Sequence, residues 1–195
     1  TKRGARDLKA YSNLPGLSVC SRLVISPDEN VSPQQRAADH GKNAHTGLLQ
    51  KYPDLAYAVV MPWVAGQTWQ EVLLGAQPLT CEQSRWLAQS LVFTMTEMEA
   101  RGIAHCDLSG PNLLLPGLKG RQTNSAIELV DVEDMFGPGF EKPSPLSSGS
   151  AGYSHKAARQ GIWGPEADRF AGGVLLAEIL GWCDSQVRRI AYGEQ

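Results

Sequence analysis

Two stretches decide how this sequence is interpreted: IAHCDLSGPNLLL at residues 103–115 and IELVDVED at residues 127–134. In the first, the acid Asp107 is followed five positions later by Asn112, and in the second Asp131 follows a short apolar run. A hairpin of the two apolar runs would bring these three oxygen-bearing side chains together. Magnesium prefers oxygen ligands and needs only one or two from the protein when a phosphate supplies others. The pattern predicts magnesium at Asn112 and Asp131, with Asp107 left to accept a proton from an attacking hydroxyl.

The segment HCDLSGPN, residues 105–112, resembles the catalytic loop H-R-D-x-x-x-x-N of protein kinases. The segment IELVDVE resembles the strand and the D-F-G segment of the same family. The resemblance implies that Asp107 is the catalytic base and that Asn112 is a catalytic residue that also binds metal. It further implies that Asp131 is the second metal ligand, and that ATP and magnesium are the cofactors.

Two more segments resemble the C-terminal lobe of a protein kinase. GSAGY, residues 149–153, is similar to the end of an activation segment. DRFAGGVLL, residues 168–176, resembles the buried helix whose first Asp anchors the catalytic loop, which assigns that role to Asp168.

The segment VVMPWVAGQTW, residues 59–69, resembles the strand and hinge that bind adenine. The resemblance makes Met61 the gatekeeper, with the carbonyl of Pro62 and the N–H of Val64 as the groups that bind the base. Proline has no N–H. Pro62 is compatible with this role because only its carbonyl would bind adenine.

The sequence departs from the kinase pattern in ways that touch phosphate binding and regulation. No G-x-G-x-x-G loop and no V-A-I-K lysine precedes the hinge, so the main cationic clamp on the phosphates is missing. Cys106 replaces the Arg that pairs with a phosphorylated activation segment, and Ser109 replaces a basic residue. Val132 and Glu133 stand in place of Phe and Gly, and Lys156-Ala157 stands where Pro-Glu is usual.

Hydrophobic periodicity predicts two long helices. The first covers residues 81–101, with Thr80 and Gln83 as a capping box and Gly102 closing its end. The second covers residues 167–180 and is apolar almost all round, which predicts a buried helix. Short apolar runs predict strands at 17–25, 55–61, 113–115 and 127–130, the last two as a hairpin, with a polar insertion at about 28–50 and an irregular loop at 137–152.

These features predict an α+β, protein kinase-like fold: a mostly helical C-terminal lobe with a short catalytic-loop hairpin, plus a partial β-rich N-terminal lobe. The expected boundaries are residues 1–61 for the partial N-terminal lobe, 62–69 for the hinge and 70–195 for the C-terminal lobe. The catalytic half is nearly whole, whereas the phosphate-covering half is largely absent, so we expect 195 residues to be too few for an entire kinase domain.

Charge and cysteine content narrow the classes of partner. The 18 basic and 20 acidic residues leave a net charge of −2 without a basic cluster, which argues against nucleic-acid and membrane-surface binding. The four cysteines are far apart in the sequence and form no C-x-x-C pair, so no zinc module or compact disulfide framework is expected. A reducing, cytoplasmic location and the absence of a secretion signal and a membrane span are predicted.

Three functions fit these motifs. The first is a divergent, bacterial-style Ser/Thr protein kinase that uses ATP and magnesium on a protein substrate. The second is a pseudokinase that serves as a scaffold or binding module, because the phosphate-binding lysine is missing. The third is a small-molecule phosphotransferase of the aminoglycoside or choline kinase type, which shares H-x-D-x-x-x-x-N and often carries an acid after the second Asp, as DVED does here. The substrate and the oligomeric state are not predicted.

Overall fold

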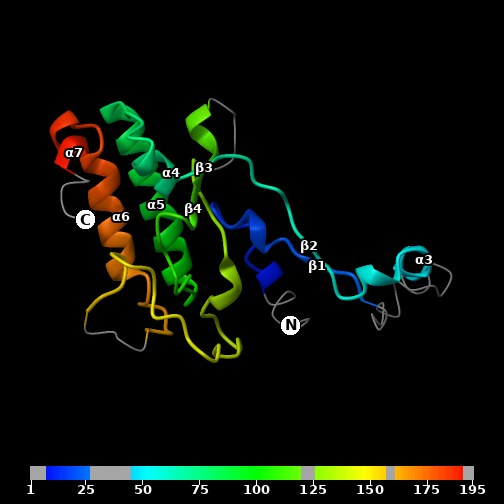
Figure 1. The fold of residues 1–195 in the computed structure, drawn as a ribbon. Coiled ribbons are helices and arrows are strands. Elements are labelled where there is room, and N and C mark those ends of the chain that lie inside the picture. Colours follow the sequence, from blue (N-terminus) through cyan, green and yellow to red (C-terminus); the bar gives the residue numbers. More distant parts are fainter. Residues whose placement is uncertain (1–7, 27–44, 120–125, 157–160, 191–195) are drawn as a thin grey trace.

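The computed structural model describes residues 8–26, 45–119, 126–156 and 161–190. It is a mixed α+β structure, as expected. The long helices lie on one side of a small three-stranded antiparallel sheet, and a separate two-stranded sheet extends away on the other side (Figure 1). Most of the polar insertion expected at 28–50 lies outside the described residues. The expected lobe boundaries stay a prediction.

The longest helix, α5 (Cys81–Ala100), begins and ends as its sequence predicts. The Gln83 N–H donates to the Thr80 hydroxyl at 3.1 Å, and the Thr80 N–H donates to the Gln83 side chain at 2.9 Å. This reciprocal pair satisfies N–H groups that the first turn leaves without helical partners. Gly102 follows the helix with φ 65°, the left-handed conformation that ends a helix.

The second long helix, α6 (Arg169–Gly181), packs beside α5. Gly172 gives room for this contact, because a Cβ there would lie 2.0 Å from Met95 Cε of α5. The expectation that α6 is buried all round is wrong. Only one face is buried, whereas Phe170 is 42% and Leu180 is 49% exposed. Among the described helices, none is long and apolar enough to cross a membrane.

The central sheet joins β3 (Gln67–Thr68), β4 (Leu113–Leu115) and β5 (Glu128–Leu129), all antiparallel. Strands β4 and β5 are the expected hairpin, with Leu113 opposite Leu129, and a 3-10 turn, η3 (Pro116–Lys119), follows β4. The rest of the hairpin tip lies outside the described residues. Thr68 also caps α4 (Trp69–Leu74), so the end of the expected hinge is a strand that leads directly into a helix.

The N-terminal strands are shorter than expected, which corrects both strand predictions there. Residues 17–25 form a 3-10 turn, η1 (Ser18–Cys20), and then β1 (Leu23–Val24). Residues 55–61 contribute the end of η2 (Pro53–Leu55) and then β2 (Val59–Val60), which pairs with β1. A helix, α3 (Thr46–Lys51), precedes them. β formers without a buried face to fill do not sustain long strands, and Val59 and Val60 are 45% and 50% exposed.

The first described residues belong to the same core as the long helices. Leu8, Leu17, Val19 and Cys20 are buried in one cluster with side chains of α5, the sheet and α6. The Leu129 N–H of β5 donates to the Gly16 carbonyl at 2.8 Å. Residues 8–20 therefore pack against the long helices and the central sheet, and Arg22 follows two residues later in the chain.

Gly16 offers a test of this docking. It has φ 78°, and a Cβ there would lie 2.8 Å from Thr94 Oγ1 of α5, so Gly16→Ala suffers both backbone strain and a clash. Gly139→Ala is the matched control, because Gly139 has φ 80° and nothing within 4 Å of its added Cβ. We expect a loss in the free energy of unfolding of about 1 kcal/mol for the control and about 2–3 kcal/mol for Gly16→Ala, measured by urea denaturation. Equal losses would show that the contact with α5 is unimportant.

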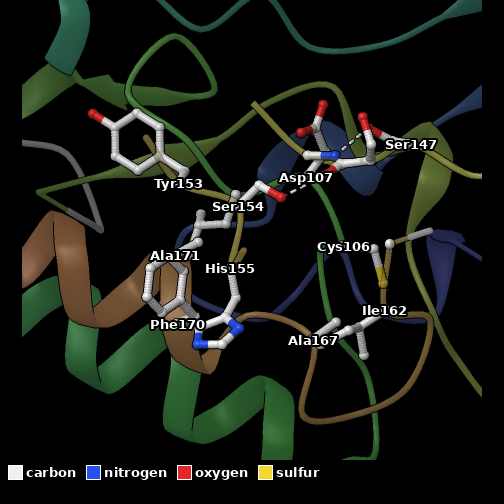
Figure 2. Close-up of a pocket in the computed structure, with 14 residues that line it drawn as sticks. Cys106, Asp107, Ser147, Tyr153, Ser154, His155, Ile162, Ala167, Phe170 and Ala171 are labelled. Carbon is white, nitrogen blue, oxygen red and sulfur yellow. Dashed lines mark hydrogen bonds between the residues drawn. The ribbon is translucent and has the colours of Figure 1, made fainter. Parts of the chain in front are cut away.

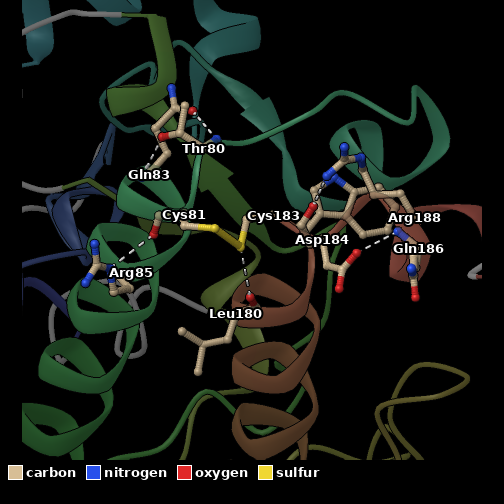
Figure 3. Close-up of a disulfide and its surroundings, with 10 residues drawn as sticks. Thr80, Cys81, Gln83, Arg85, Leu180, Cys183, Asp184, Gln186 and Arg188 are labelled. Carbon is tan, nitrogen blue, oxygen red and sulfur yellow. Dashed lines mark hydrogen bonds between the residues drawn. A yellow bond between two sulfur atoms is a disulfide. The ribbon is translucent and has the colours of Figure 1, made fainter.

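A disulfide joins Cys81, the first residue of α5, to Cys183, just beyond α6 (Figure 3). The wide spacing of the cysteines indicated no disulfide framework, so this pairing differs from the sequence-based expectation. Residues 102 positions apart become neighbours because α5 and α6 pack side by side, with Cα atoms 5.0 Å apart at the bond. The short helix α7 (Ser185–Ile190) follows, and Arg188 donates to the Trp182 carbonyl behind it.

Candidate active site

The loop that carries Asp107 is anchored by Asp168, the residue before α6. The carboxylate of Asp168 accepts hydrogen bonds from the backbone N–H groups of His105, at 2.6 Å, and Cys106, at 2.9 Å. The side chain is only 7% exposed, and burial raises its pKa, while the charge of His105 and the two N–H donors act against that rise. The anchoring role that the resemblance assigned to Asp168 matches these contacts.

His105 connects the same loop to the end of β5. Its ring is fully buried, and Nε2 lies 2.8 Å from the Val130 carbonyl. A carbonyl can only accept, so Nε2 carries the hydrogen in this contact. Two backbone hydrogen bonds between Ala104 and Phe136 join the loop to the chain beyond Asp131 as well. His105 is therefore a packed residue that holds two parts of the site together.

Asp107 and Asn112 lie on this anchored loop and are joined by a hydrogen bond. The Asn112 amide Nδ2 donates to the Asp107 backbone carbonyl at 2.9 Å, which leaves the amide oxygen as the group able to bind a cation. The half-buried carboxylate of Asp107 is not used in that contact. Its Oδ1 instead accepts a hydrogen bond from the Ser150 hydroxyl at 3.3 Å. The base candidate is thus already in contact with an alcohol of the chain.

Asp131 lies next to Asn112, because the Val130 N–H donates to the Asn112 carbonyl at 3.0 Å. Its backbone is left-handed, with φ 61° and ψ 53°, and it leads into the 3-10 turn η4 (Val132–Asp134). Val132 is fully buried and takes the place expected for an apolar side chain, whereas Asp131 is exposed. A hydrogen bond with Glu133, followed by burial and the charges of Glu133 and Asp107, raises the pKa of Asp131.

Asn112 and Asp131, the residues predicted to bind magnesium, lie at neighbouring ends of β4 and β5. Asp107, Asp131 and Glu133 place several acidic groups close together, and a divalent cation would relieve their mutual repulsion. In the described part of the chain, no group of three His, Cys, Asp or Glu side chains could hold a metal. The carboxylate of Asp131 and the amide oxygen of Asn112 would leave further positions for water and phosphate, which is how magnesium is usually bound.

A second group of polar contacts, which sequence reasoning missed, lies on the other side of Asp107. Glu178 of α6 accepts hydrogen bonds from the Tyr153 hydroxyl at 2.8 Å and from Trp69 Nε1 at 2.9 Å. Gly110 makes room for the Tyr153 ring, because a Cβ there would lie 2.9 Å from the Tyr153 oxygen. The available signal was a single acid, Glu178, within an otherwise apolar helix.

A cavity of about 440 Å³ opens at this group. Its walls include Leu73 and Trp182 on one side and Pro111 and Ser150 on the other. Because Ser150 touches Asp107 and Pro111 precedes Asn112, the cavity begins beside the candidate catalytic residues. It provides a place where the side chain of an acceptor could bind.

A smaller cavity, of about 40 Å³, is lined by both Asp107 and Cys106 (Figure 2). Ser147, Ser154 and Phe170 surround the same space. Cys106 has φ 66°, so the residue that replaces the usual Arg is held in a left-handed conformation. Burial raises the pKa of Cys106 to about 12, which keeps it as an unreactive thiol.

The thiols allow a chemical test. Burial also raises the pKa of Cys20 to about 12, so both free cysteines of the folded chain carry roughly a thousandfold less thiolate near pH 8 than at the reference pKa of 9.0. We expect negligible alkylation by iodoacetamide of the native chain, two labels in urea and four after reduction in urea, measured by mass spectrometry. Rapid native labelling of Cys106 would contradict its burial, and four labels without reductant would contradict the Cys81–Cys183 bond.

The hinge candidates lie in the extended segment between β2 and β3. Met61 and Pro62 are exposed, whereas Val64 packs against the core. The central sheet connects them to the loop that carries Asp107, because β3 pairs with β4, the strand that follows Asn112. The cavities described above are lined by other residues. Trp63, between Pro62 and Val64, is 92% exposed.

The structure thus brings Asp107, Asn112 and Asp131 together and leaves Met61, Pro62 and Val64 apart from them, in the segment that joins the two sheets. Comparison of the sequence with models of protein families and with curated proteins finds no match. What the site does must be inferred from its own geometry.

Proposed function

We propose that this chain carries the catalytic part of an ATP-dependent protein kinase that transfers a phosphoryl group to Ser or Thr hydroxyls of proteins. The observation that carries the proposal is the contact between the Ser150 hydroxyl and Asp107 Oδ1, beside the oxygen groups of Asn112 and Asp131. A carboxylate that accepts a hydrogen bond from an alcohol is placed to take that proton during transfer.

Each residue of the site has a distinct proposed role. Asp107 orients the acceptor hydroxyl and accepts its proton as the oxygen attacks the γ-phosphorus of ATP, while the bond between the β- and γ-phosphates breaks and ADP leaves. Asn112 and Asp131 would hold magnesium, which supplies positive charge to the phosphate oxygens. Asp168 and His105 are positioning residues, because they fix the loop that carries Asp107 to α6 and to the end of β5. Positioning of this kind accounts for most of the catalysis in phosphoryl transfer.

We assign adenine binding to the extended segment at Met61, Pro62 and Val64. Backbone groups there are not consumed by a long strand, since β2 ends at Val60 and β3 begins at Gln67. The Pro62 carbonyl and the Val64 N–H offer an acceptor and a donor for the base.

A protein acceptor is favoured over a small molecule by the segment around Ser150. The irregular segment around Ser150 contacts Asp107, the proposed catalytic base. The 440 Å³ cavity is lined by Ser150 at one point and by Glu178 and Trp182 at others. An extended peptide could follow that path. A pseudokinase scaffold is the second candidate, favoured by the missing phosphate-binding lysine.

The proposal implies a cytoplasmic location, because ATP is supplied there. Disulfides are rare in that compartment. A chain in that compartment would therefore form the Cys81–Cys183 bond only on oxidation, as in the purified protein of the labelling test.

The test is transfer of labelled phosphate from ATP with magnesium, using the chain with a mixture of protein acceptors, and separately with aminoglycosides and choline. We expect label on Ser and Thr of proteins, and a magnesium-dependent rise in melting temperature with ATP. Label on the small molecules alone would favour the small-molecule phosphotransferase. Binding of ATP without transfer to any acceptor would favour the pseudokinase.

A further inference from the structure

Arg22 is a buried cation at the edge of the candidate site. It lies directly before β1, and its side chain is only 8% exposed. The guanidinium Nη1 is 2.7 Å from Glu133 Oε1, and Nε donates to the Val19 carbonyl at 3.3 Å. A charged side chain with so little exposure is held by its partners rather than by water.

The partner of Arg22 connects it to the candidate metal ligands. Glu133 comes two residues after Asp131, within the 3-10 turn that Asp131 begins. The Glu133 carboxylate is 52% exposed, so the pair reaches the surface at the site rather than being enclosed in the core. The burial of residues 17–20 fixes the backbone from which Arg22 extends.

Arg22 retains donors for a further ligand. A guanidinium has five N–H groups in a planar fork, which suits phosphate oxygens. Its contacts with the described residues engage Nε and Nη1, so N–H groups on both terminal nitrogens are left for an acceptor. The other arginines of α5, α6 and α7 have partners elsewhere: Arg101 pairs with Glu97 and Arg169 with Glu99, and Arg188 donates to the Trp182 carbonyl. Arg85 and Arg189 each donate Nε to a carbonyl one turn earlier in their own helices.

We infer that Arg22 binds the phosphates of the nucleotide and supplies the positive charge that the sequence lacks in the absence of a V-A-I-K lysine. This inference rests on the proposed function. Without nucleotide, Glu133 holds the guanidinium beside Asp131; with nucleotide, the remaining N–H groups meet phosphate oxygens next to the magnesium ligands. Val19 and Glu133 keep the fork oriented, so little side-chain freedom is lost when phosphate binds.

The experiment compares a ligand that has phosphates with one that does not. Binding of ATP with magnesium and of adenosine is measured by calorimetry for the wild-type chain, Arg22→Gln, Arg22→Lys and the control Arg101→Gln. We expect Arg22→Gln to weaken ATP binding by roughly 10- to 100-fold, from the loss of charged hydrogen bonds, and to change adenosine binding less than twofold. Arg22→Lys is expected to recover part of the loss, and Arg101→Gln to leave both ligands unchanged.

Each outcome separates this inference from the proposed function. If the wild-type chain bound neither ligand, the proposed function would fail, and the inference with it. Suppose instead that the wild-type chain binds ATP. The inference alone would then be overturned if Arg22→Gln kept the full ATP affinity, or if it lost affinity for ATP and for adenosine by the same factor. Should Arg22→Gln unfold, Arg22→Lys decides instead: it must weaken ATP binding more than adenosine binding, and its ATP affinity must stay above one tenth of the wild type.

Discussion

Asp107→Asn is expected to lower phosphoryl transfer by roughly 10²- to 10⁴-fold, while ATP still binds. Asparagine keeps the shape of the side chain but cannot take a proton from the acceptor hydroxyl. The contact that the Asp107 side chain makes with Ser150 is at 3.3 Å, and the Asn112 amide bonds the backbone of Asp107 rather than its carboxylate. The loop therefore stays in place, and the melting temperature should change little. The measurement is initial rate with labelled ATP, together with a melting curve.

Glu97→Gln is the matched control for Asp107→Asn. It makes the same carboxylate-to-amide change on α5, where Glu97 pairs with Arg101 at the surface. Exposed pairs of this type contribute little to stability, so activity and melting temperature should both stay close to the wild type. If Asp107→Asn retained the rate of this control, Asp107 would not be the base.

The long helices and the hairpin could be predicted because local signals and tertiary packing agree there. In α5, the cap at Thr80 and the apolar period specify the same helix that packing requires. At residues 17–25, β-branched residues indicated a strand, yet Leu17 and Val19 are used to fill the core from a 3-10 turn. Propensity alone cannot show which apolar residues meet a partner far away in the sequence.

The residues of the candidate site can likewise be separated into those that local sequence signals predict and those that they do not. Asp107, Asn112 and Asp131 were predictable because the hairpin that unites them is a local feature. Glu178 and Arg22 were not, since each reaches the site from a segment distant in the sequence. The expected glycine after Asp131 is replaced by Glu133, and the left-handed conformation occurs at Asp131 itself, a residue type that tolerates it better than most.

Asp168→Ala is expected to have the largest effect on stability. Removing the carboxylate leaves the N–H groups of His105 and Cys106 buried without partners, at a cost of about 2–5 kcal/mol in the free energy of unfolding. The loop that carries Asp107 then loses its attachment to α6, so activity should fall even in the fraction that remains folded. Urea denaturation gives the stability, and the rate per folded molecule gives the second effect.

Asp184→Ala is the control that isolates burial. Asp184 also accepts a backbone N–H with its carboxylate, from Gln186 at 2.7 Å, but at the exposed start of α7. Water can replace that contact, so the loss should be about 1 kcal/mol or less, typical of a helix cap. If the two alanine variants lost equal stability, the N–H groups of His105 and Cys106 would have to find other partners when Asp168 is removed. The catalytic loop would then be held mainly by His105 and the Ala104–Phe136 hydrogen bonds, and activity per folded molecule should survive.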